Sequence, residues 1–253
     1  MTEFVKITSV QNDIVKYAVK LQNSKFRKSE KMIFADGEKT ISGFINDNIE
    51  IEYLFLKEEN QIYKNANAKK VVFVTDEILK KISSVKTPSS AAAILKEPDI
   101  DADEICNLNK IALFEDIKDA GNLGTILRSA AAFSIEGIVL FGDCVDLYNT
   151  KVIRSTAQNI FKLPIIRTSD KDYIKKLKNN HKLIATVVDS NKSFSKEYFG
   201  DKFILAFGSE AAGLSKDLRD LSDEALSLKM DNNVESLNLA VCASIAFALI
   251  KLN

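Results

Sequence analysis

Three segments of this 253-residue chain combine small residues with polar side chains that bind anions or take up protons. They read DAGNLGTILRS from Asp119, FGSEAAGLS from Phe207 and KMDNNVESLNLAV from Lys229. A guanidinium group and helix N–H groups can together hold an anion such as phosphate, and a carboxylate can accept a proton. A fold that brings the three segments together would create a site with both abilities.

The first segment predicts an anion-binding corner at the start of a helix. Asn122 can cap that helix, and Arg128 lies further along it. Because helical side chains lean toward the N-terminus of their helix, Arg128 would reach back over Gly124 and Thr125 toward the cap. Free helix N–H groups and the guanidinium would then face the same anion. A capped helix with an ordinary surface arginine is the alternative that these residues leave open.

The other two segments contribute a carboxylate and further capping groups. Gly208 and Gly213 bracket Glu210, which lets the backbone pass close to a ligand. None of the segments matches the dinucleotide-binding pattern or the P-loop pattern, so sites of those two kinds are disfavoured. Ser236 is a suitable N-cap for a helix over residues 237–252, with Asn238 in its first turn. Both side chains could simply satisfy free helix N–H groups.

The elements around these segments predict an α/β fold. After residue 109, the apolar runs KIALFEDI, GIVLF, LPII, KLIATVVD, KFILAFG and ALSLK alternate with helical segments. Strands that are apolar throughout are covered on both faces, which indicates a mainly parallel, doubly wound sheet. Ligands of such sheets bind beyond the carboxyl ends of the strands. Each of the three polar segments follows one of the predicted strands, so we expect them to meet at that edge.

The first part of the chain predicts a second, smaller α/β domain. Apolar residues recur at helical spacing over residues 9–27, beside a basic rim that includes Lys25, Arg27 and Lys28. Four short runs of strand-forming residues follow, which read MIFADG, IEYLFLKE, VVFVT and AAAILKE. Polar helical segments separate them.

An acidic stretch, EPDIDADEICNLN, lies between the two parts and lacks any helical or strand periodicity. It predicts a linker. We therefore expect a domain over residues 1–97, a linker over residues 98–108 and a second domain over residues 109–253.

Composition and cysteine content restrict the class of protein. With 35 basic and 35 acidic residues the chain lacks the basic excess of a passive nucleic-acid coat, so any basic patch must be local. Its three cysteines have no metal-ligand spacing and are odd in number, so we expect no metal site and a reduced, cytoplasmic location. No signal peptide or membrane-spanning run is apparent, and we expect no membrane association.

His181 lies in a polar run that predicts a surface loop, and Cys242 is expected in the core.

The three polar segments, in this order, resemble the motifs of the SpoU (TrmH-like) branch of the SPOUT RNA ribose 2′-O-methyltransferases. The matching stretches are DAGNLGTILRSAAAF, LAFGSEAAGLS and ESLNLAVCASIAF, and NTKVIRSTAQNIFKLP between them is also similar to a family segment. Residues 9–41 resemble the accessory substrate-binding domain of the ribosomal-RNA members. The chain departs from the pattern at Lys229, where relatives often carry a proline, and in FADGEK, where a branched residue and a glutamate commonly precede the glycine.

The resemblance implies a deep trefoil knot in the C-terminal domain, with S-adenosylmethionine bound in the knotted loops, and a homodimer packed through that domain. It also implies transfer of the cofactor's methyl group to a ribose 2′-hydroxyl of RNA, with 23S ribosomal RNA as the expected substrate. By position, the cofactor contacts would be Thr186, Val187, Gly208, Leu228, Met230 and Leu237. The catalytic residues would be Asn122, Arg128, Glu210, Ser236 and Asn238.

Within that site we expect Arg128 to bind the phosphate beside the target ribose and to stabilise the developing alkoxide, because a guanidinium hardly deprotonates in proteins. Glu210 is our candidate for the group that takes the proton, although it could instead orient Arg128 as an ion-pair partner. Asn122, Ser236 and Asn238 would hold the ribose and the arginine by hydrogen bonds.

The expected contacts to the rest of the RNA are Arg154, Lys25, Arg27 and Lys28. Two alternatives stay open: a transfer-RNA enzyme of the same family, and a non-catalytic RNA-binding protein on the same fold. The additional N-terminal domain favours ribosomal RNA by analogy. A protein that only binds RNA has no need of a polar constellation spread over three loops, which favours an enzyme.

Overall fold

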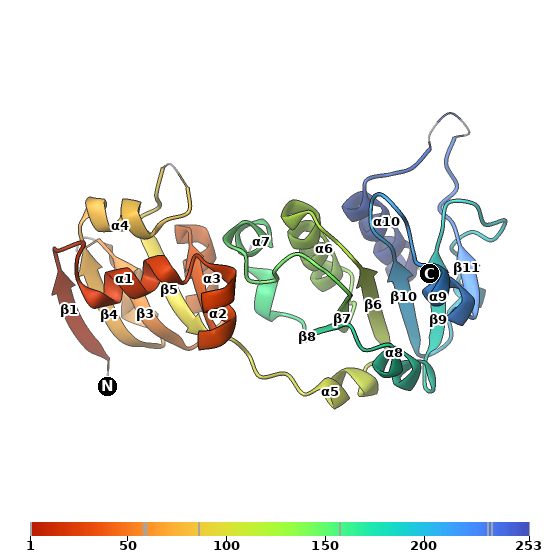
Figure 1. Cartoon of the computed structure of the whole chain (residues 1–253), viewed down its shortest axis with the longest axis horizontal. Coiled ribbons are helices and arrows are strands. Elements are labelled where there is room, and N and C mark those ends of the chain that lie inside the picture. The colour runs from red at the N-terminus through yellow and green to blue at the C-terminus, as the bar shows by residue number, and fades with distance from the viewer. Residues whose placement is uncertain are drawn as a thin grey trace. The chain divides into compact units, whose positions relative to one another are not determined.

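The computed structural model describes residues 2–57, 60–85, 87–156, 158–231, 233 and 235–252. By their contacts, Met1–Asp99 and Asp146–Gln158 form one compact unit, here called unit 1, while Ile100–Val145 and Asn159–Asn253 form unit 2 (Figure 1). The main difference from the predicted domains is the segment Asp146–Gln158. It lies within the predicted C-terminal domain but belongs to unit 1 by its contacts.

Unit 1 is built on a mixed sheet of five described strands in the order β1-β4-β3-β5-β2. The strands are β1 (Glu3–Ile7), β2 (Met32–Asp36), β3 (Ile51–Leu56), β4 (Ala68–Val74) and β5 (Ala91–Lys96). β4 pairs in parallel with β1 and β3, whereas β5 is antiparallel to β3 and β2. The sequence predicts four of these strands and misses β1. This edge strand buries only Ile7 and therefore shows no apolar run.

The helix predicted over residues 9–27 is wrong, because two helices occupy this stretch. The helices of unit 1 are α1 (Asp13–Lys20), α2 (Ser24–Glu30), α3 (Glu38–Asn46), the 3-10 helix η1 (Ile62–Asn65), α4 (Asp76–Ile82) and α7 (Thr150–Ser155). Asn12 caps α1, and the side chain of Asn23 accepts hydrogen bonds from the N–H groups of Lys25 and Phe26 to start α2. α1 ends at Lys20 with Leu21 as its C-cap, and the N-cap at Asn23 then starts a second helix.

The segment Asp146–Gln158 is fastened to the rest of unit 1 by two ion pairs. Arg27, which is only 5% exposed, pairs with Asp146, and Arg154 donates to buried Asp36 at 2.9 Å. The segment thus supplies Asp146 and Arg154, and the rest of unit 1 supplies Arg27 and Asp36. The side chain of Gln158 also lies against Gly43 of α3, where a Cβ atom would come within 2.0 Å of Gln158 Oε1.

Unit 2 contains six described strands in the order β11-β9-β10-β6-β7-β8, and every pairing is parallel. The strands are β6 (Lys110–Glu115), β7 (Gly137–Phe141), β8 (Ile165–Thr168), β9 (Lys182–Thr186), β10 (Phe203–Phe207) and β11 (Glu224–Leu226). The predicted doubly wound parallel sheet is confirmed. The chain runs outward from β6 through β7 and β8 and then continues on the other side of β6, so β6 and β10 flank a topological switch point.

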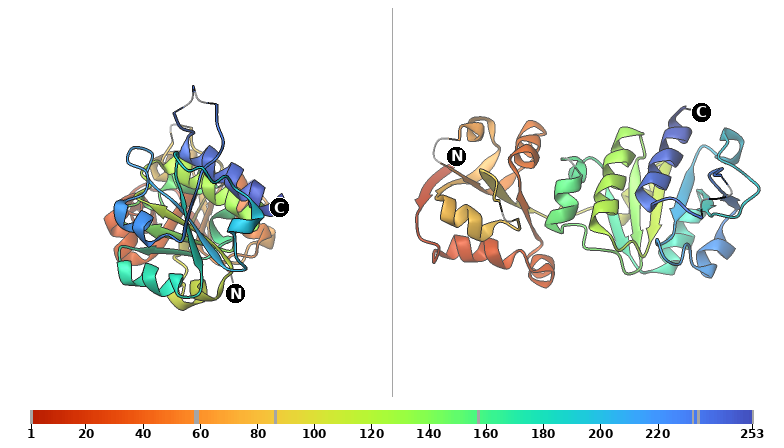
Figure 2. Two further views of the ribbon diagram at one scale, coloured as in Figure 1. Left: turned by 90° about the vertical axis from the view of Figure 1, so that its right-hand side faces the viewer. Right: turned by 90° about the horizontal axis from the view of Figure 1, so that it is seen from above.

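Helices cover both faces of this sheet (Figure 2). They are α5 (Ala102–Asn107), α6 (Ala120–Ala132), α8 (Lys171–Lys178), α9 (Lys216–Leu221) and α10 (Leu239–Leu252), with short 3-10 helices η2 (Asn159–Phe161) and η3 (Lys196–Tyr198). α6 and α10 pack together on one face. Beneath these helices the ring of Phe207 stacks on that of Phe114, with 5.1 Å between the ring centroids. It also meets the ring of Phe247 edge-on, with a centroid distance of 5.9 Å. α5, α8 and α9 pack on the opposite face through apolar residues such as Ile105 and Ile174.

Two local predictions differ from the structure of unit 2. The predicted linker contains α5, which Asp101 caps and which buries Ile105; six residues are too few to show helical periodicity. His181 is buried rather than in a surface loop, and its ring nitrogens lie 2.8 Å and 2.7 Å from the carbonyl oxygens of Leu177 and Leu108.

No helix of the described residues has both the length and the apolar character needed to cross a membrane. The trefoil knot stays a prediction of the resemblance.

Candidate active site

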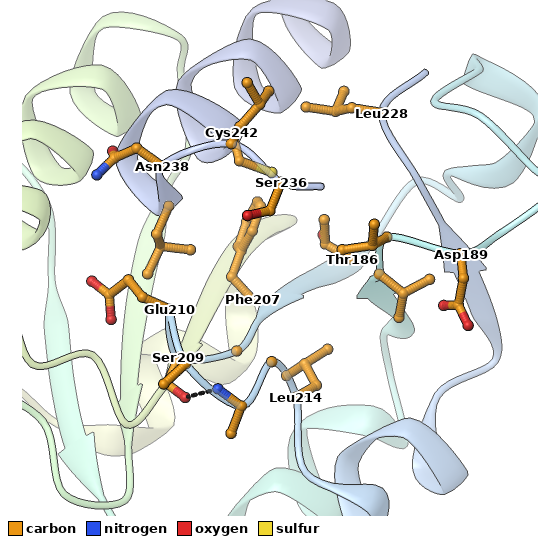
Figure 3. Close-up of a pocket in the computed structure, with 18 of the residues that line it drawn as sticks. Thr186, Asp189, Phe207, Ser209, Glu210, Leu214, Leu228, Ser236, Asn238 and Cys242 are labelled. Carbon is orange, nitrogen blue, oxygen red and sulfur yellow. Dashed lines mark hydrogen bonds between the residues drawn. The ribbon is translucent and has the colours of Figure 1, made fainter. Parts of the chain in front are cut away.

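A pocket of about 550 Å³ opens at the carboxyl ends of β9 and β10 (Figure 3). Its walls come from segments that are far apart in the sequence: residues 186–189, the loop 207–214, Leu228 and Met230, and the start of α10. The structure brings together in this pocket all of the residues predicted to contact a cofactor, which are Thr186, Val187, Gly208, Leu228, Met230 and Leu237. Three predicted catalytic residues, Glu210, Ser236 and Asn238, line it as well.

A chain of hydrogen bonds joins the three polar segments. The side-chain amide of Asn122 donates to Glu210 Oε1 at 2.6 Å, and the amide of Asn238 donates to Asn122 Oδ1 at 3.0 Å. Asn122 lies at the start of α6, Glu210 follows β10, and Asn238 precedes α10. Figure 3 shows Glu210 and Asn238 on the same side of the pocket, across from Asp189. The convergence of the three segments expected from the strand pattern is therefore present.

The helix caps differ from those predicted. Asp119, not Asn122, caps α6, because its side chain accepts a hydrogen bond from the N–H of Asn122. Asn238, not Ser236, caps α10, since its side-chain oxygen accepts from the N–H groups of Ala240 and Val241. In both cases another capping residue lies a few positions away in the sequence. The side-chain amide groups of Asn122 and Asn238 therefore stay available to connect the segments.

The loop after β10 depends on glycine at two positions. A Cβ atom on Gly208 would lie 1.8 Å from the carbonyl carbon of Gly213, so the two limbs of the loop could not approach each other with any other residue there. Gly213 has φ +67, a left-handed conformation that favours glycine. Ser209 and Gly213 form a bridge across the loop. This closed turn places Glu210 at the wall of the pocket.

Arg128 lies on α6 with its side chain exposed, outside the hydrogen-bonded chain of Asn122, Glu210 and Asn238. It does not line the pocket among the described residues. Ser236 lines the pocket beside Cys242 (Figure 3). The structure thus brings four of the five predicted catalytic residues together and places the fifth on the surface of α6.

The structure places two of the four predicted RNA contacts, Arg27 and Arg154, in ion pairs of unit 1. Arg27 is buried, and its guanidinium donates to the carbonyl oxygens of Leu21 and Gln22 at 2.8 Å as well as to Asp146. Arg154 is held by buried Asp36 and by Ser84 Oγ at 2.6 Å. Both arginines stabilise the packing of unit 1, because each pairs with an aspartate from a remote part of the chain. Lys25 and Lys28 are exposed on α2 and stay predicted RNA contacts.

The sequence analysis missed several residues of the pocket, among them Asp189, Arg219 and Cys242. Asp189 lies three residues beyond β9, so the rule on carboxyl ends of strands could have found it. Cys242 is expected in the core, but it is four residues after Asn238 and therefore shares a face of α10 with the cap. Burial raises the pKa of its thiol, which keeps this wall of the pocket neutral. Nothing in the sequence around Arg219 marks it as a pocket residue.

The fold and the pocket define a class of protein: a doubly wound parallel sheet whose switch point carries a small-molecule pocket edged by hydrogen-bonding side chains. A family model supports this class directly. Residues 109–248, more than half of the chain, match the SpoU rRNA Methylase family, and residues 12–93 match the MRM3-like substrate binding domain. The chain belongs to the SpoU rRNA methylase family.

Individual relatives match most of the chain. The 23S rRNA (guanosine(2553)-2′-O)-methyltransferase RlmP of Bacillus subtilis is 26% identical over 95% of this chain and 96% of its own length. The 23S rRNA (uridine(2479)-2′-O)-methyltransferase of Streptomyces viridochromogenes is 25% identical over 73% of this chain and 67% of its own. An AdoMet-bound rRNA methyltransferase from Sinorhizobium meliloti has the same fold, with a TM-score of 0.87, 24% identity and 98% of each chain covered.

Proposed function

We propose that this chain transfers the methyl group of S-adenosylmethionine to a ribose 2′-hydroxyl of 23S ribosomal RNA. The observation that carries the proposal is the hydrogen-bonded set of Asn122, Glu210 and Asn238 at the edge of a largely apolar pocket. The B. subtilis and S. viridochromogenes relatives are 23S rRNA 2′-O-methyltransferases, which supports the substrate. The cofactor in the S. meliloti structure supports the methyl donor.

The pocket fits S-adenosylmethionine by size and by chemistry. Its volume of about 550 Å³ falls within the range of roughly 300 to 1,000 Å³ that is usual for small-molecule sites. Leu228, Met230 and Leu237 offer apolar contacts for the adenine. The Thr186 hydroxyl is buried without a hydrogen-bond partner among the described residues. When bound, the cofactor supplies a methyl group already activated on a sulfonium.

The protein residues must then orient the ribose hydroxyl and remove its proton. Orientation of the reactants contributes the larger share of the rate acceleration, because it can lower the activation barrier by roughly 7 to 11 kcal/mol. A general base accelerates the reaction by about 10²- to 10⁴-fold, which corresponds to a smaller reduction of the barrier. Asn122 donates to Glu210 Oε1, which fixes the carboxylate and leaves Oε2 to accept the proton of the 2′-hydroxyl. Asn238 fixes Asn122 in turn. Ser236 completes the ribose contacts from the rim of the pocket.

Arg128 binds the phosphate next to the target ribose and stabilises the developing alkoxide. Its exposed guanidinium presents paired donors to phosphate oxygens. In unit 1, exposed Lys25 and Lys28 contact the RNA further away.

The enzyme acts as a homodimer in the cytoplasm, where ribosomal RNA is modified. Support for the dimer comes from α10, which leaves the large apolar side chains of Val241, Ile245 and Leu252 exposed. Apolar surface of this kind on a catalytic unit is typical of a protein interface.

Replacement of Arg128 tests the proposal. We expect Arg128→Ala to abolish transfer of tritiated methyl groups to ribosomal RNA, while calorimetry shows nearly unchanged binding of S-adenosylmethionine. Arg167→Ala, on β8 of the same unit and away from the pocket, is the control and should retain activity. Turnover by Arg128→Ala would remove this guanidinium from the mechanism. Failure of the unaltered protein to bind S-adenosylmethionine or to methylate RNA would overturn the proposed function as a whole.

A further inference from the structure

The described walls of the pocket carry three charged side chains, of which two are negative and one is positive. Asp189 and Glu210 are acidic, and Arg219 is the only basic residue among the described residues of the lining. S-adenosylmethionine carries the opposite set, since its sulfonium and its ammonium are cationic and its carboxylate is anionic. The charges of the pocket are therefore complementary to those of the cofactor in number and in sign.

Arg219 is held in place by the loop that closes the pocket. Its Nε donates to the carbonyl oxygen of Leu214 at 2.8 Å. Leu214 directly follows Gly213, at the end of the loop that carries Glu210. One donor of the guanidinium is thus used to fix the side chain at the wall, and the terminal amino groups keep the paired geometry that matches a carboxylate.

Resting on the proposed function, we propose that Arg219 binds the carboxylate at the methionine end of S-adenosylmethionine and so makes the pocket specific for nucleosides with an amino-acid tail. Glu210 is held by Asn122 on the side of the hydrogen-bonded chain and would face the reacting sulfonium there. Asp189 lies on the opposite side of the pocket (Figure 3). The apolar residues between them suit the uncharged adenosine, which leaves Arg219 for the single anionic group of the cofactor.

A series of three nucleosides separates this role from a general effect on the pocket. S-adenosylmethionine has the tail and the sulfonium charge, S-adenosylhomocysteine has the tail without that charge, and 5′-deoxy-5′-methylthioadenosine has neither. Calorimetry on the full chain should show that Arg219→Ala weakens binding of the first two by about tenfold or more, as expected for loss of a charge-assisted pair. Binding of methylthioadenosine should be unchanged, which also shows that the pocket is intact.

Two further variants complete the design. Arg219→Gln keeps an N–H donor for Leu214 and removes the charge, so it should lose affinity for the tailed nucleosides as Arg219→Ala does. Lys216→Ala removes a positive charge from the same helix but outside the described lining of the pocket, and it should change none of the three affinities.

Equal loss for all three nucleosides, or no loss for any, would overturn the role of Arg219. Weaker RNA binding with an unchanged nucleoside series would also overturn it and would assign the guanidinium to RNA. Each of these results is distinct from failure of the proposed function, in which the unaltered protein itself would bind neither S-adenosylmethionine nor S-adenosylhomocysteine.

Discussion

Arg27 and Arg128 lie in opposite surroundings although both were expected to meet RNA. Arg128 is exposed on α6, whereas Arg27 is 5% exposed and surrounded by two carbonyl oxygens and the carboxylate of Asp146. Neighbouring residues on a helix do not reveal which of these surroundings an arginine has. The burial of Arg27 makes its partner Asp146 a residue on which the stability of unit 1 depends.

We expect Asp146→Asn to destabilise the protein by about 3 kcal/mol near neutral pH, because it leaves a buried guanidinium without its anionic partner. Asp172→Asn, which breaks an exposed ion pair with Lys175, should have a far smaller effect. Denaturant unfolding of both variants and of the unaltered protein measures the difference. An equal effect of the two substitutions would contradict the importance of the buried pair.

The same pair predicts how stability depends on pH. Burial alone would raise the pKa of Asp146, but hydrogen bonds from Arg27 and Ser24 and the charge of Arg27 outweigh it, so the pKa is lowered from its ordinary value of 3.8. Below that value the unfolded chain takes up this proton before the folded chain does, so stability is lost as the pH falls further. The difference between Asp146→Asn and the unaltered protein should shrink in that acidic range and stay constant above it.

At the scale of elements, the loop from Gly208 to Leu214 determines whether the pocket can form. It is closed by backbone contact between Gly208 and Gly213, and both Glu210 and the anchor of Arg219 depend on that closure.

We expect Gly208→Ala to abolish binding of S-adenosylhomocysteine while the protein stays folded, because a Cβ atom 1.8 Å from the backbone of Gly213 must force the loop open. Gly200→Ala is the matched control, since the nearest atom to its Cβ is a carbonyl oxygen at an ordinary 3.8 Å. Calorimetry measures binding and circular dichroism measures the fold. Retained binding by Gly208→Ala would show that the closed loop is not required.

The elements also show what the sequence could predict. Strands such as β6 and β10 are buried on both faces, so their apolar runs identify them and their carboxyl ends locate the site. The two predicted helix caps were wrong because Asp119 lies close to Asn122, and Asn238 close to Ser236, and each of these side chains can cap a helix. The aspartates that pair with Arg27 and Arg154 are more than a hundred residues away in the sequence, and no local sequence pattern predicts such ion pairs.

At the scale of the whole molecule, the exposed apolar residues of α10 predict self-association. We expect the unaltered protein to be a dimer by light scattering at micromolar concentration and Ile245→Asp to be a monomer, because a carboxylate would be buried in the interface. Phe4→Asp replaces a large apolar residue that is 55% exposed in unit 1 and should leave the dimer intact. A monomeric unaltered protein, or a dimer unaffected by Ile245→Asp, would exclude this face of α10 as the contact.

The two units are joined by three peptide bonds, those after Asp99, Val145 and Gln158. A gene fragment that begins at Ile100 would therefore still encode Asp146 and Arg154 but would lack Arg27 and Asp36, their counter-ions. It would also lack β2, against which α7 packs. Recombination with a single crossover therefore could not exchange the whole of unit 1, because unit 1 is formed by two separate stretches of the chain. A chimaera that swaps it must also replace the stretch nested within the catalytic gene segment.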